Sequence, residues 1–67
     1  MVNLGEQIKK RRKSLKVTQR QLADLSGVSI NTLTKIERGE GNPRLQILER
    51  ILDTLGLELS THIKSIE

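Results

Sequence analysis

The chain has 67 residues, a formal net charge of +4 and a sequence pI near 10.0. It contains no Cys, Trp, Tyr or Phe and a single His, which excludes disulfides and a zinc site built from thiolates or several imidazoles. A chain of this length supports one domain with one small core, and without covalent or metal cross-links such chains are usually helical, dimeric or both.

The charged side chains are unevenly distributed along the chain. Residues 1–44 carry ten basic and four acidic side chains, a net charge of +6, whereas residues 45–67 carry two basic and four acidic ones, a net charge of −2. This division is typical of a polyanion-binding face followed by an assembly region, although a solvated lysine-rich surface accounts for the charge alone equally well. No run approaches the length of a membrane-spanning helix and the N-terminus lacks an apolar signal core, so we expect a cytoplasmic protein.

The first predicted helix begins after Asn3. Arg12 falls on the apolar stripe of this helix. A charged group there must either pair with a partner or extend to solvent at the edge of the core. The run KKRRK at residues 9–13 cannot all face a core, so most of it is expected to form a basic outer face. Three apolar residues define the stripe: Leu4, Ile8 and Leu15.

The stretch TQRQLADLSGVSINTLTKIERGE, residues 18–40, predicts two helices joined by a tight turn. Thr18 and Gln21 have the spacing of a capping box at a helix N-terminus. Gly27 interrupts the pattern where a left-handed backbone is needed, and Ser29 caps the next helix almost at once. So short a link makes the two helices cross steeply, as in a DNA-binding helix-turn-helix. The predicted helices span about residues 19–26 and 30–38.

This stretch resembles the helix-turn-helix of the lambda-type phage repressor and Cro family, which includes small bacterial regulators and antitoxins. The resemblance implies an all-α, four-helix, lambda-repressor-like DNA-binding domain over residues 1–56, and it implies an ion pair between Arg12 and Glu37. No catalytic triad, phosphate loop, metal cluster or cofactor motif is present, so we expect neither an enzyme nor a cofactor. The resemblance covers about residues 4–56 and rests on Thr18, Gln19, Leu22, Ala23, Gly27, Val28, Ser29, Thr32, Leu33, Ile36, Glu37 and Gly39.

A fourth helix is predicted after a short loop, GEGNPR at residues 39–44. Gly39 is expected to end the preceding helix, Asn42 to cap the fourth helix, and Pro43 to take its first position. Gly56 ends it. The helix carries more apolar surface than one neighbouring helix would cover, contributed by Leu45, Ile47, Leu48, Ile51, Leu52 and Leu55.

The hydrophobic period changes to two in the segment LELSTHIK, residues 57–64. Such alternation is typical of a β-strand, yet a lone strand leaves its backbone unpaired. We therefore predict that residues 57–67 form a dimerisation tail, whose strand pairs with the same strand of a second copy across a two-fold axis. A frayed tail and a fifth helix are the alternatives. The predicted dimer contacts are Leu57, Leu59, Thr61 and Ile63.

The resemblance also assigns DNA contacts, because the second helix of the motif lies in the major groove with its N-terminal residues near base edges. The candidate base-reading residues are Ile30, Asn31, Thr34 and Lys35. The candidate phosphate contacts are Thr18, Gln19, Ser29, Thr32, Arg38 and Arg44.

The predicted function is sequence-specific binding of double-stranded DNA by a homodimeric transcriptional regulator that reads an inverted-repeat operator through the helix at 30–38. Repression by occlusion of a promoter is the expected outcome, and activation stays open. The alternative is an antitoxin that binds a toxin protein and autoregulates its operon.

Overall fold

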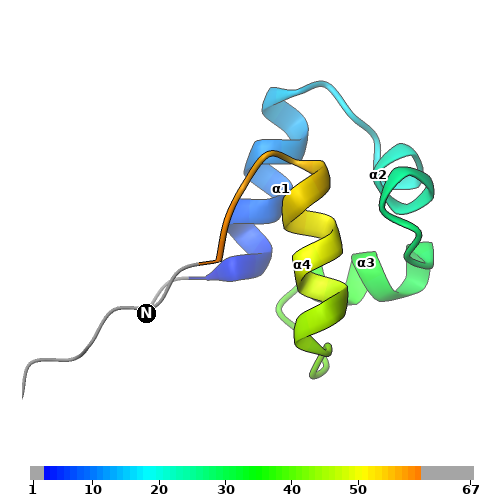
Figure 1. The fold of residues 1–67 in the computed structure, drawn as a ribbon, viewed down its shortest axis with the longest axis vertical. Coiled ribbons are helices and arrows are strands. Elements are labelled where there is room, and N and C mark those ends of the chain that lie inside the picture. Colours follow the sequence, from blue (N-terminus) through cyan, green and yellow to red (C-terminus); the bar gives the residue numbers. More distant parts are fainter. Residues whose placement is uncertain (1–2, 60–67) are drawn as a thin grey trace, which may run out of the picture.

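The computed structural model of the protein describes residues 3–59, and these residues fold as four helices (Figure 1). The expectation of an all-α, four-helix domain is confirmed over this range, which contains no strand. The helices are α1 (Leu4–Ser14), α2 (Gln19–Ser26), α3 (Ile30–Glu37) and α4 (Leu45–Thr54).

Local capping signals set the bounds of α2 and the start of α3 as the sequence predicted. The Thr18 hydroxyl accepts the Gln21 backbone N–H at 3.0 Å, and the Gln21 side chain accepts the Thr18 N–H at 2.9 Å. Gly27 adopts a left-handed backbone with φ 71°, and the Ser29 hydroxyl then accepts the Thr32 N–H at 3.2 Å. Each contact spans only three residues, so the helix-turn-helix is encoded locally.

The start of α4 corrects the sequence prediction. We expected Asn42 to cap this helix and Pro43 to open it, but the N-cap is Arg44 and the first helical residue is Leu45. Arg44 has an extended backbone, with φ −68° and ψ 149°, and its carbonyl accepts hydrogen bonds from the backbone N–H groups of Ile47 and Leu48 at 3.0 and 3.1 Å. Proline tolerates this extra-helical position equally well because its missing N–H is not needed there. The end of α3 also differs by one residue, since Arg38 is its C-cap.

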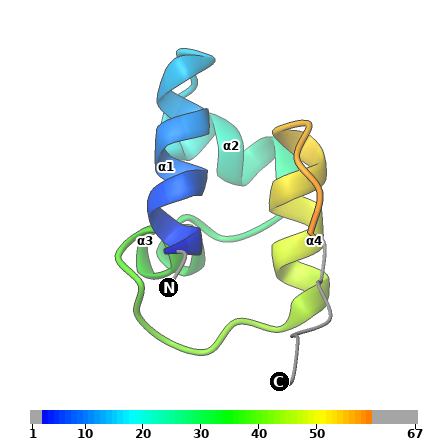
Figure 2. The ribbon, with the colours of Figure 1, turned by 90° about the vertical axis from the view of Figure 1, so that its left-hand side faces the viewer.

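The four helices share one hydrophobic core. In Figure 2, α1 and α4 stand on opposite sides of the view, and the loop from α3 to α4 sweeps below them. Two residues predicted to lie in apolar stripes are instead 44% and 59% exposed, namely Leu15 and Leu45. Leu15 is the C-cap of α1 and Leu45 is the first residue of α4, so both stand at helix ends. The core consists of Ile8, Leu22, Ala23, Val28, Leu33, Ile36, Ile51, Leu52 and Leu55.

The segment after α4 closes the end of that helix. Gly56 is left-handed with φ 71°, and the Leu57 N–H donates to the Leu52 carbonyl at 2.8 Å. The Leu57 side chain packs against the core, whereas Leu59 is 45% exposed. Residues 57–59 form no strand, and the other two predicted dimer contacts, Thr61 and Ile63, lie outside the described residues. Strand pairing between two copies therefore stays a prediction.

Gly5 is a structural requirement that sequence reasoning missed. It is buried in the first turn of α1, where this helix meets the end of α3. A Cβ atom at this position would overlap the backbone carbonyl oxygen of Ile36 and lie 3.0 Å from that of Glu37. The absence of a side chain thus allows the two helix backbones to approach closely.

Gly5→Ala is expected to destabilise the fold although alanine is the better helix former. Alanine gains about 1 kcal/mol of helix propensity, but overpacking against rigid backbone typically costs about 1–3 kcal/mol. Urea unfolding followed by circular dichroism measures the net change. Lys10→Ala, at an exposed position of the same helix, serves as the control and should change stability little. A Gly5→Ala protein as stable as Lys10→Ala would contradict the close approach.

Candidate nucleic-acid interface

The outer face of α3 presents the predicted base-reading residues with different degrees of exposure. Asn31 and Lys35 are exposed, whereas Ile30 and Thr34 are half-buried. Ile30 packs against the core, and the Thr34 hydroxyl donates to the Ile30 carbonyl at 2.8 Å. Asn31 and Lys35 are therefore the side chains of this set that stand freely in solvent.

The predicted phosphate contacts lie at the N-termini of α2 and α3 and in the loop after α3. Thr18 and Ser29 are N-caps, and the Ser29 hydroxyl also donates to the Thr32 hydroxyl at 2.8 Å. The backbone N–H groups at such helix starts attract anions. Arg38 and Arg44 are exposed at the two ends of the loop that joins α3 to α4.

An ion pair between Arg12 and Glu37 lies beneath this surface, as the resemblance implied. The Arg12 guanidinium donates through Nε to one carboxylate oxygen of Glu37 at 2.7 Å and through a terminal nitrogen to the other at 3.0 Å. Its second terminal nitrogen donates to the Val17 carbonyl at 2.8 Å. The side chains of Arg12 and Glu37 are only 9% and 3% exposed. The pair ties α1 and the segment before α2 to the end of α3.

Gln19 joins this pair, which the sequence did not reveal. Its side-chain amide nitrogen donates to Glu37 at 3.0 Å, and its amide oxygen lies 3.5 Å from the Thr34 hydroxyl. Gln19 is the first residue of α2 and is half-buried. The sequence assigned it only a phosphate contact, because no local spacing relates residue 19 to residue 37.

The surroundings of Glu37 keep its carboxyl group ionised. Burial raises its pKa, but hydrogen bonds from Arg12 and Gln19 and the positive charges of Arg12 and Lys9 outweigh that effect and hold the pKa of Glu37 below its ordinary value. The buried carboxylate is therefore a permanent hydrogen-bond acceptor at neutral pH.

The basic run at residues 9–13 divides between structural and exposed roles. Arg12 is used in the ion pair, and Arg11 donates through Nε to the Leu55 carbonyl at 3.0 Å, where it caps the end of α4. Lys10, Arg11 and Lys13 are exposed and Lys9 is half-buried. Most of the run therefore forms the expected basic outer face, and Arg12 is the residue of the run that is buried.

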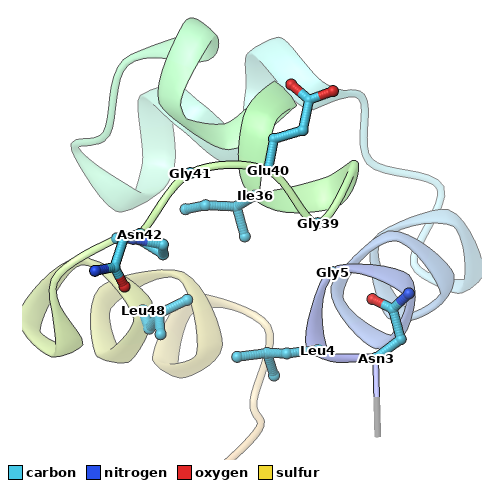
Figure 3. Close-up of a pocket in the computed structure, with 10 residues that line it drawn as sticks. Asn3, Leu4, Gly5, Ile36, Gly39, Glu40, Gly41, Asn42 and Leu48 are labelled. Carbon is cyan, nitrogen blue, oxygen red and sulfur yellow. The ribbon is translucent and has the colours of Figure 1, made fainter. Parts of the chain in front are cut away.

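A groove of about 670 Å³ opens between the start of α1, the end of α3 and α4 (Figure 3). Leu4, Ile36 and Leu48 line it together with the loop at residues 39–43. Residues 3–59 hold no cluster of side chains suited to a metal ion, and none of their helices is long and apolar enough to cross a membrane.

Comparison with known proteins places this geometry in a family. A sequence profile described as "Helix-turn-helix" matches residues 8–61. The chain belongs to this helix-turn-helix family. The match includes the capped turn between α2 and α3 and both members of the buried ion pair.

Relatives of this helix-turn-helix chain carry names of regulators. The "Immunity repressor protein" of Bacillus phage phi105 is 41% identical over 59 residues, covering 88% of this chain and 41% of the phage protein. The "Cryptic phage CTXphi transcriptional repressor RstR" of Vibrio cholerae is 34% identical over 58 residues, covering 87% of this chain and 52% of RstR. The chain thus spans about half the length of these repressors or less. An "Uncharacterized HTH-type transcriptional regulator" of Methanothermobacter thermautotrophicus is 39% identical over 59 residues, 88% of this chain and 81% of the relative.

The buried pair predicts a defined dependence of stability on pH. Because the pKa of Glu37 is lower in the folded chain than in the unfolded one, its stabilisation is complete above the ordinary glutamate pKa of about 4.3 and is lost as the pH falls through the folded value. Urea unfolding should show the wild type more stable than Glu37→Gln at pH 7, on the order of 3 kcal/mol. This difference should shrink below about pH 4.

Glu40→Gln is the matched control, since it removes an exposed carboxylate from the loop after α3. Its stability should follow that of the wild type within about 0.5 kcal/mol at neutral pH. Equal stabilities of the wild type and Glu37→Gln at pH 7 would show that the pair has no structural consequence.

Proposed function

We propose that this chain is a sequence-specific double-stranded DNA-binding transcriptional regulator, a repressor, that acts as a homodimer and reads an inverted repeat through α3. The observation that carries the proposal is the exposed face of α3 within a helix-turn-helix. Asn31 and Lys35 lie in solvent on this face, and the buried pair of Arg12 and Glu37 holds the end of the helix. The net charge of +6 over residues 1–44 supports a polyanion as the ligand.

The side chains on α3 match the chemistry of base edges in the major groove. Asn31 suits the donor and acceptor pair of adenine, and Lys35 suits the two acceptors of guanine. Ile30 and the methyl group of Thr34 offer apolar contacts to a thymine methyl group. Asn31 and Lys35 are four residues apart, so they lie on one face of the helix and reach neighbouring base pairs.

Phosphate contacts would hold α3 in register on the duplex without reading sequence. The start of α2 offers the Thr18 hydroxyl, the Gln19 amide and free backbone donors to one phosphate. Arg38 and Arg44 are exposed beyond the end of α3, where they would neutralise further phosphates. Ser29 and Thr32 add hydroxyl groups at the start of α3.

Two observations support the proposed dimer: the small size of a single interface, and the apolar side chains that the described residues leave exposed. One motif of this size buries too little surface for tight specific binding. Leu45 and Leu59 are 59% and 45% exposed, and Leu4 and Leu48 line an open groove. To read two half-sites, such a dimer needs its two α3 helices about 34–36 Å apart, one turn of DNA, and a two-fold symmetric dimer would then select an inverted repeat.

In-vitro selection of DNA bound by the purified protein tests the function and the role of Asn31 together. The wild type should enrich an inverted repeat. Asn31→Ala should lose preference at one position of each half-site, because one bidentate contact discriminates between bases by about 1–3 kcal/mol. Asn42→Ala, the same truncation in the loop before α4, should return the wild-type site. Failure of the wild type to enrich any DNA at low salt would contradict DNA recognition, and an unchanged site for Asn31→Ala would contradict the assignment of that residue.

Arg38→Ala should weaken binding to all DNA sequences alike. The logarithmic dependence of affinity on salt should flatten by about one for each phosphate contact that the substitution removes, and so by about two in a dimer. Affinity titrations at several salt concentrations measure this slope. Arg50→Ala removes the same charge from an exposed position of α4 and should leave the slope nearly unchanged. Equal slopes for the two variants would exclude a phosphate contact at Arg38.

A further inference from the structure

The carboxylate of Glu37 connects the two DNA-facing elements of the proposed interface. It ends α3, which carries the exposed Asn31 and Lys35, and it accepts a hydrogen bond from Gln19 at the start of α2. On its other side it is held by Arg12 through two hydrogen bonds. Both oxygens are thus occupied, and the group is buried. Its position relative to Gln19 is therefore fixed by the core and by α1.

An ionised carboxylate also decides which way the Gln19 amide points. The two ends of an amide group have similar shapes, but a carboxylate only accepts hydrogen bonds. The amide nitrogen must therefore face Glu37, and the amide oxygen lies toward the Thr34 hydroxyl at 3.5 Å. The nitrogen carries two hydrogens, and the one that Glu37 does not take remains a donor for an anion at the surface.

We infer that Glu37 is a positioning residue for DNA binding, which holds the Gln19 side chain and the first turn of α2 in place to contact a phosphate. This inference rests on the proposed function. Glu37 itself does not touch DNA, since its side chain is only 3% exposed. It acts by keeping the phosphate-contacting start of α2 in a fixed geometry relative to the base-reading face of α3.

The sign of the effect separates positioning from simple electrostatics. Glu37→Gln raises the net charge of the protein by one, and this change alone would tighten binding to a polyanion. Loss of positioning weakens it, because the carboxylate accepts three hydrogen bonds from Arg12 and Gln19 through its two oxygens. A neutral amide at residue 37 has one accepting oxygen, and its NH2 group would face one of these donors, so it cannot accept all three. Glu40→Gln makes the same charge change on an exposed side chain and provides the matched control.

The test measures the affinity of the full chain for its selected duplex at one salt concentration. Circular dichroism determines the folded fraction of each variant, and the affinity is expressed for that fraction. Glu37→Gln should bind about five- to tenfold more weakly per half-site, the scale of one hydrogen bond, whereas Glu40→Gln should bind equally well or more tightly. Ile51→Val, which lowers stability through the core at α4, should leave the affinity of the folded protein unchanged. Affinity of Glu37→Gln equal to that of Glu40→Gln would overturn the inference.

A double-mutant cycle with Gln19→Ala establishes whether Glu37 acts through Gln19. In the Gln19→Ala background, Glu37→Gln should cause little further loss of affinity. An undiminished loss there would overturn the inference and leave the proposed function intact, whereas a wild type that binds no DNA would overturn the proposed function itself.

Glu37→Asp provides a second variant should Glu37→Gln fold poorly, because it keeps the charge but shortens the reach toward Gln19 by one methylene. It should show a similar loss that also depends on Gln19. Wild-type affinity for Glu37→Asp would contradict positioning by Glu37.

Discussion

The structure depends on the buried contact between Arg12 and Glu37. A charge removed from water is strongly unfavourable unless it is paired and fully hydrogen-bonded, and here the guanidinium donates three hydrogen bonds, to Glu37 and to the segment before α2. Among residues 3–59 no buried side-chain nitrogen or oxygen lacks a hydrogen-bond partner. The geometry of the pair therefore fixes how α1 lies against the end of α3 and how the chain enters α2. A chain without disulfides gains from this contact a specific register that apolar packing alone does not define.

The close approach of α1 and α3 at Gly5 supports the same arrangement. The ion pair sits two turns further along α1, so the two helices are fixed at two points. At Gly5 the close approach of the backbones requires a residue without a side chain. At Arg12 the buried charge requires the carboxylate of Glu37 as its partner. Both contacts act on the end of α3 and thereby position the outer face of this eight-residue helix.

The basic residues of α1 show why a count of charges is a poor guide to a binding face. Arg11 is bound to the end of α4 and Arg12 to Glu37, although both belong to a run that looks like a uniform cationic surface. Their charges still contribute to the field around the protein, but their Nε donors are occupied. The direct contacts proposed for DNA fall instead on α3, on the start of α2 and on the loop that contains Arg38 and Arg44.

The sequence by itself determined the features that depend on neighbours within about four residues. It defined the capping box at Thr18, the left-handed turn at Gly27, the helix-turn-helix and the apolar seam. Only the tertiary structure decided which groups meet across long stretches of chain: Gly5 against Ile36, Arg11 against Leu55, and Gln19 against Glu37. It also moved the start of α4 from Pro43 to Leu45, because an extended Arg44 fits the same loop signals. Hydrophobic periodicity indicates which face of a helix is buried, but it does not indicate which polar partner the other helix brings to it, and this arrangement is set by packing.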